Sequence, residues 1–181
     1  MFEIQESKGG TAMAIMYIGE INETIWSLVA EIAEILAFRH GGTSSDWLKT
    51  MQKTRYFTLL LDRKTGLMNE GSPFLAREFE KELGLKHVDK MINWKKTKWS
   101  PIDAQAEIVF ELYNTCRLSK EQVTELLEKS TILERARDAY ELVFMDGAQQ
   151  FLSDIRASIK KECGIGYRVQ RRHNENKQVR V

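Results

Sequence analysis

The chain carries few side chains that could do acid–base, nucleophilic or metal chemistry, and their spacing matches no common motif. Its three histidines, His40, His87 and His173, form no His-Glu-x-x-His or Glu-x-x-His pattern, which a zinc hydrolase or a di-iron bundle requires. His40 stands beside Gly41, where we expect it to interact with the C-terminus of the preceding helix. We therefore expect neither a metal site nor a bound cofactor.

The carboxylates and cysteines also lack a catalytic pattern. Glu107 and Glu111 are spaced to lie on one helix face and could share a proton or a cation, but without a histidine nearby such pairs usually form a solvated face. Cys116 and Cys163 are too far apart for a redox motif, so we expect two reduced thiols, with Cys116 on a core-facing helix. The sequence predicts that the protein is not an enzyme, unless its fold assembles a site from distant residues.

The charges are balanced overall but unevenly distributed. The chain has 27 Lys and Arg residues against 26 Asp and Glu residues, so its net charge gives no reason to expect nucleic acid or a membrane as partner. Residues 101–155 contain 11 acids and 5 bases, whereas residues 156–181 contain 8 bases and 2 acids. The second half is therefore predicted to be acidic and the tail basic.

The candidate binding residues lie in two segments with many bases. In the first, bases alternate with aromatic side chains, a pattern that suits a phosphate backbone and base stacking; we favour the alternative that its tryptophans hold a linker on the core. The basic tail could dock on the acidic half, contact an acidic partner or bind nucleic acid. The predicted binding residues are Trp94, Lys95, Lys96, Lys98 and Trp99 in the first segment and Arg168, Arg171 and Arg172 in the tail.

Five helix-start signals show how the chain would position these residues. Ser72 and Ser100 each precede a proline, the order typical of an N-cap and a first helical residue. Thr43, Ser119 and Asp146 each stand three residues before an acidic or glutamine side chain, as in a capping box. Each signal lies just before an apolar stripe, which favours a helical chain.

Apolar side chains at helical spacing predict seven helices joined by short connections. They run near residues 25–36, 47–51, 74–83, 104–116, 123–127, 133–143 and 151–159. We therefore expect a mainly α, compact helical bundle. Short β-hairpins are expected at the two ends, within residues 2–18 and 167–181, with frayed ends as the alternative.

The two halves of the chain can be aligned when a few gaps are allowed. Glu31-Ile32 then falls on Glu107-Ile108, and Phe74-Leu75 on Phe151-Leu152. An internal duplication would give this match, and so would two unrelated series of amphipathic helices. The expected organisation is an N-terminal helical unit (1–84), a Trp/Lys-rich linker (85–100), a C-terminal helical unit (101–162) and a basic tail (163–181).

The N-terminal region indicates where the protein resides. Its first residues are acidic and have no basic segment, so we expect no signal peptide. The apolar stretch from residue 12 to residue 38 is interrupted by Glu20, Glu23, Glu31 and Glu34, which argues against a helix that spans a bilayer. We expect a cytoplasmic protein that has no membrane partner.

The second unit resembles a known family. Its segments 118–123, 139–142 and 151–155, with Gly147 between the last two, are similar to a family of short, uncharacterised bacterial helical proteins grouped as a domain of unknown function. The resemblance covers residues 106–156. Family members often carry a histidine before the glycine, whereas this chain has Val143-Phe144-Met145-Asp146, so no role of that histidine transfers. Some members are encoded beside toxin-like proteins, which implies an antitoxin-like or partner-binding role.

These observations favour a non-enzymatic protein-binding module of bacterial or phage origin: an antitoxin, inhibitor or adaptor. Its partner would be another protein, toxin-like or defence-related, and a second copy of the chain is also possible. The alternative is a nucleic-acid-binding protein that uses the Trp/Lys linker and the basic tail. A helix-turn-helix reader is disfavoured because Glu134, Asp138 and Glu141 on its second helix would repel phosphates.

Overall fold

The computed structural model describes residues 10–90 and 99–170, with side chains described from residue 25 onward. Within these ranges the chain forms nine α-helices and no strand, which confirms the mainly α prediction. The expected hairpins include residues 2–4 and 178–181, which lie outside the described residues, so the hairpins stay predictions.

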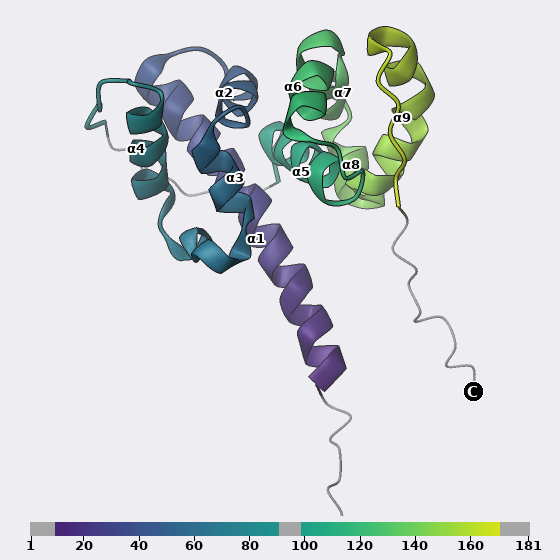
Figure 1. Ribbon diagram of the computed structural model, residues 1–181, viewed down its shortest axis with the longest axis horizontal. Coiled ribbons are helices and arrows are strands. Elements are labelled where there is room, and N and C mark those ends of the chain that lie inside the picture. Colours follow the sequence, from purple (N-terminus) through teal and green to yellow (C-terminus); the bar gives the residue numbers. More distant parts are fainter. Residues whose placement is uncertain (1–9, 91–98, 171–181) are drawn as a thin grey trace, which may run out of the picture.

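Two groups of helices make up the described part of the chain (Figure 1). The first group is α1 (Gly10–His40), α2 (Ser44–Met51), α3 (Arg55–Leu61) and α4 (Ser72–Glu82), with short 3₁₀ turns at Arg63–Thr65 and Leu67–Asn69. The second group is α5 (Pro101–Asn114), α6 (Lys120–Lys129), α7 (Ile132–Asp138), α8 (Tyr140–Asp146) and α9 (Ala148–Cys163). Helices α2 and α4 pack on α1, while α7, α8 and α9 pack on α5, and α1 and α5 pack on each other.

The described helices outnumber the seven predicted ones for two reasons. Helix α3 was not predicted, because it is only seven residues long and buries only Phe57 and Leu60. The segment predicted as one helix near residues 133–143 is divided at Ala139, whose backbone (φ −111°, ψ 27°) leaves the helical region. The division changes the direction of the chain between α7 and α8.

Three predicted N-caps are confirmed. The Thr43 side chain accepts a hydrogen bond from the backbone N–H of Asp46, at 3.1 Å, at the start of α2. The carboxylate of Asp103 accepts hydrogen bonds from the backbone N–H and the hydroxyl of Ser100, at 2.9 and 2.7 Å, at the start of α5. Ser119 and Gln122 cap α6 reciprocally. These caps fix where the helices begin because they satisfy backbone N–H groups that have no partner inside the helix.

Two predicted N-caps are wrong. Gly71 caps α4, and Ser72 is its first helical residue. Asp146 ends α8 instead of capping α9, and Gly147, with φ +83°, occupies the cap position. The cause at Asp146 is that Val143, 1% exposed, anchors α8 in the core, so the helix continues to this aspartate.

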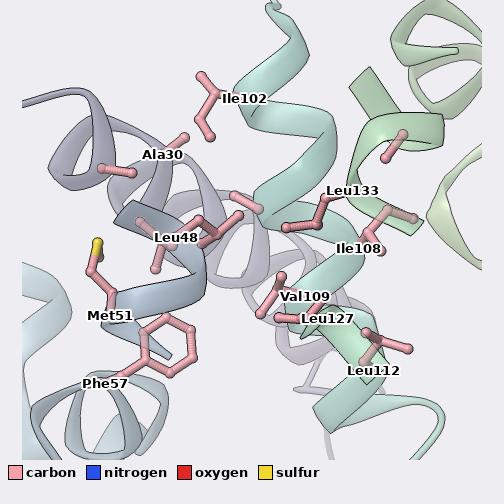
Figure 2. Close-up of a cluster of buried hydrophobic side chains, with 14 of the residues drawn as sticks. Ala30, Leu48, Met51, Phe57, Ile102, Ile108, Val109, Leu112, Leu127 and Leu133 are labelled. Carbon is pink, nitrogen blue, oxygen red and sulfur yellow. The ribbon is translucent and has the colours of Figure 1, made fainter. Parts of the chain in front are cut away.

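One hydrophobic core joins the two groups of helices. Figure 2 shows side chains of α1, α2, α3, α5, α6 and α7 meeting in a single cluster, with Val109 of α5 near its centre. Buried polar bonds add to this contact: Gln105 accepts a hydrogen bond from Ser45 at 2.7 Å and donates one to the carbonyl of Leu133 at 2.8 Å. The two halves therefore share their apolar interior.

In the ranges that the structure describes, no helix combines the length and the apolar character needed to cross a membrane.

Candidate functional site

Two of the eight predicted binding residues, Trp99 and Arg168, lie in the part of the chain that the structure describes. The remaining six fall in segments 91–98 and 171–181, outside the described residues: Trp94, Lys95, Lys96, Lys98, Arg171 and Arg172. Arg168 is exposed and lies on the segment that follows α9. It lines a groove beside α9 whose lining residues do not include Trp99.

Trp99 is partly buried and packs against the core. Its indole N–H donates a hydrogen bond to the backbone carbonyl of Tyr140, at 3.0 Å, where α8 begins. Its ring meets the ring of Trp26 of α1 edge to face, with centroids 5.0 Å apart, and lies 5.5 Å from the ring of Phe144. Trp99 thus ties α1, α8 and the start of α5 together, and stacking on a nucleobase would require breaking these contacts.

Helix α8 presents an apolar face to solvent. Leu142 is 50% exposed, Phe144 65% and Met145 68%. These three residues, which we name the α8 face, lie within four consecutive positions. The other large hydrophobic side chains exposed in the described ranges, Phe38 and Phe74, stand singly on α1 and α4.

Two anchors fix the orientation of the α8 face. Val143 lies in the core, and the carbonyl of Tyr140 is held by Trp99. In a helix of seven residues, burying position 143 directs positions 142, 144 and 145 away from the core. The apolar side chains are therefore exposed by a fixed helix, and large exposed apolar side chains gathered on one short helix are typical of an interaction site.

Carboxylates flank the α8 face at both ends of the helix. Glu141 and Asp146 are exposed, and neither forms an ion pair with another described residue. Asp138, at the end of α7, is exposed and pairs with Arg137. The surface is thus apolar at its centre and negative at its edge, which favours a partner with an apolar patch that lysines or arginines surround.

A second cluster of charges surrounds a buried carboxylate in the first group of helices. Glu80 of α4 is 1% exposed and lies between three basic side chains. One carboxylate oxygen is 3.2 Å from the Arg39 guanidinium and 2.9 Å from the His40 ring. The other oxygen is 2.6 Å from the His87 ring, in the segment after α4. We name this set the Glu80 cluster.

Opposing effects act on the pKa of Glu80. Burial alone would raise this pKa, because it disfavours the charged form. Hydrogen bonds from His87 and His40 and the positive charge of Arg39 outweigh burial and hold the pKa below its ordinary value. Glu80 is therefore an ionised carboxylate that joins the end of α1 to α4 and to the segment behind α4.

The Glu80 cluster was missed at the level of sequence, where His40 was expected to interact with the helix terminus. A signal was present: Ala76 and Phe79 are buried on α4, and Glu80 follows Ala76 by four residues, so it lies on the same helix face. A carboxylate on a buried face needs basic partners, and His87 stands seven residues after Glu80 in the sequence.

The cysteines are free, and the described titratable side chains form no metal-ligating group. Both cysteines are free thiols, and burial together with the charge of Glu111 raises the pKa of Cys116 to about 12. Cys116 follows the last residue of α5 rather than lying in the helix. Across residues 10–90 and 99–170, no three His, Cys, Asp or Glu side chains are grouped so that they could hold a metal ion.

The chain matches no known protein-family model, no curated protein sequence and no solved structure.

Proposed function

We propose that the protein is a non-enzymatic protein-binding module of the antitoxin, inhibitor or adaptor type, and that the α8 face is its contact surface. The observation that carries the proposal is the exposure of Leu142, Phe144 and Met145 on one fixed helix. The same function is what the family resemblance expected from residues 106–156 would imply, since some members of that family are encoded beside toxin-like proteins.

The exposed area is large enough to contribute substantially to binding. Full burial of a large apolar side chain is worth about 1.5–3 kcal/mol, and the three side chains of the α8 face are between 50% and 68% exposed. Covering them would therefore contribute roughly 3–5 kcal/mol, which is about 10²- to 10³-fold or more in affinity. An apolar cluster of this kind, with polar groups at its rim, is the usual centre of a protein–protein contact.

The carboxylates beside the α8 face, Glu141 and Asp146, indicate which charges the partner carries. Because Glu141 and Asp146 form no ion pair with another described residue beside the α8 face, the partner is expected to be a protein with an apolar patch and basic side chains around it. Such complementarity speeds association and selects the partner, while the apolar contact supplies most of the affinity.

Affinity purification from the native host tests this function. The tagged wild-type chain would be compared with a Leu142→Ser/Met145→Ser variant, which keeps the contact between Phe144 and Trp99. Phe74→Ser is the matched control, since Phe74 is 46% exposed on α4, away from α8. We expect one protein to co-purify stoichiometrically with the wild type and the control and to be depleted with the α8 variant. Equal recovery with all three chains would refute the role of α8.

A further inference from the structure

A groove lies between α9 and the segment that follows it. The chain reverses at Gly164, whose φ of +77° a residue with a side chain rarely adopts, and it returns alongside α9 (Figure 1). Tyr167, 4% exposed, fixes the returning segment because its hydroxyl donates a hydrogen bond to the carbonyl of Leu152 at 2.9 Å. The backbone is therefore fixed on both sides of the groove, by α9 on one side and by the hydrogen bond of Tyr167 on the other.

The groove is lined by basic side chains and contains no carboxylate. It encloses about 420 Å³ and is lined by Arg156, Ala157, Lys160, Gly166, Tyr167 and Arg168. The alkyl chain of Lys160 lies along Gly166, where a Cβ would approach it to 3.6 Å. Arg156 and Lys160 are one helical turn apart on the same face of α9, about 6 Å along its axis.

The three cations are not neutralised by the described part of the chain. Arg156, Lys160 and Arg168 are exposed, and none forms an ion pair with a described residue. Two acids lie on α9 beside these cations: Glu162 is held by Arg135 and Thr131 of the neighbouring helix pair, and Asp154 accepts a hydrogen bond from Gln150 at 2.8 Å. The groove therefore carries three positive charges available for an anion.

We propose that this groove binds the phosphodiester backbone of a nucleic acid, with Arg156, Lys160 and Arg168 each contacting a phosphate. Arginine and lysine are the side chains that hold phosphates in this way, and the turn that separates Arg156 from Lys160 is comparable to the distance between neighbouring phosphates of a strand. This binding is separate from the contact proposed for α8.

The form of the anion follows from the surroundings. The sequence continues with further bases, among them Arg171 and Arg172, which matches a long polyanion better than a single small phosphate. No large exposed hydrophobic side chain lines the groove, so an acidic peptide would find no apolar anchor. The aromatic ring among the lining residues, that of Tyr167, is buried and cannot stack on a base. Because contacts to phosphates carry no sequence information, the binding is independent of sequence.

Fluorescence anisotropy with the full chain and a short labelled DNA duplex tests the proposal. The wild type would be compared with Arg156→Gln/Lys160→Gln and with a control pair, Arg77→Gln/Lys86→Gln. The control removes the same charge from exposed positions in the first half. We expect the groove variant to bind about tenfold more weakly at low salt, and its slope of log affinity against log salt to fall by about 1.8. The control is expected to bind as the wild type does.

Three results would overturn the proposal. The first is no binding of the wild type at low salt to the duplex, to single-stranded DNA or to RNA. The second is an equal loss in the groove variant and the control, which would assign the binding to overall charge. The third is equally tight binding of polyglutamate, which would assign the groove to an acidic protein. Circular dichroism of each variant checks its fold, and Arg168→Gln provides an independent change if the double variant does not fold.

Discussion

Replacing Glu80 with glutamine should destabilise the protein strongly. The change keeps the size of the side chain but removes the charge that Arg39, His40 and His87 share. Because the side chains of Arg39 and Glu80 are only 7% and 1% exposed, water cannot take the place of the lost carboxylate. Removing one partner of a buried ion pair costs about 3–5 kcal/mol. In a chain of this size that loss lowers Tm by roughly 6–20 °C.

The same variant makes a prediction about pH. The pKa of Glu80 in the folded protein is lowered below its ordinary value, so its stabilising effect is complete above the unfolded-state pKa of about 4.3. The effect is lost as the pH falls through the lowered folded-state value. The difference in free energy of unfolding between wild type and Glu80→Gln is therefore expected to be largest at neutral pH and to shrink below about pH 4.3.

Urea unfolding over a pH series measures both effects. Glu78→Gln is the matched control on α4, because Glu78 pairs only with the exposed Lys81, and the loss there should stay below about 1 kcal/mol. If Glu80→Gln lowers the free energy of unfolding no more than Glu78→Gln does, the buried charge of Glu80 does not stabilise the fold as proposed. An equal loss of free energy of unfolding at neutral and at acidic pH would also contradict the stabilising role of the ionised carboxylate.

Three further changes test other parts of the structure. Trp99→Phe should lower the free energy of unfolding by about 1–3 kcal/mol, because the carbonyl of Tyr140 loses its indole donor; no change in thermal or urea unfolding would contradict the contact. Ser119→Ala should cost about 1 kcal/mol through loss of the α6 cap, and Ser119→Asp should restore most of it in the same measurement. Cys116, whose pKa burial and Glu111 raise to about 12, should resist alkylation by iodoacetamide near pH 8 until urea unfolds the chain. Rapid labelling of native Cys116, detected by mass spectrometry, would contradict its placement.

Local features of the fold were predictable where neighbouring residues alone determine them. The caps at Ser100 and Ser119 depend on side chains three residues away, so the sequence shows both partners. Helix α3 has a local cap at Thr54, but it also depends on a distant group. The carboxylate of Glu82 accepts hydrogen bonds from the backbone N–H groups of Arg55 and Tyr56, at 2.6 and 2.8 Å, and this contact exists only once α4 is in place.

The α8 face could not be predicted because apolar or aromatic side chains occupy five of the seven positions of α8. Tyr140, Leu142, Val143, Phe144 and Met145 offer no polar stripe that would distinguish the inner side of the helix from the outer one. The break between α7 and α8 selects Val143 for the core. The sequence shows part of the Glu80 cluster, because it contains a carboxylate at a buried helical position and two histidines. The contact between His40 and Glu80 depends on how α1 and α4 pack.

Site-specific photo-crosslinking in the native host tests directly whether α8 is the protein's contact surface. A benzoylphenylalanine would be placed at position 145 on the α8 face and, in a separate chain, at position 74 on α4, two exposed positions on separate helices. If α8 is the contact surface, position 145 gives one discrete adduct and position 74 gives none. The adduct is lost when Leu142→Ser is added. No adduct from position 145, or the same adduct from both positions, would contradict this role of α8.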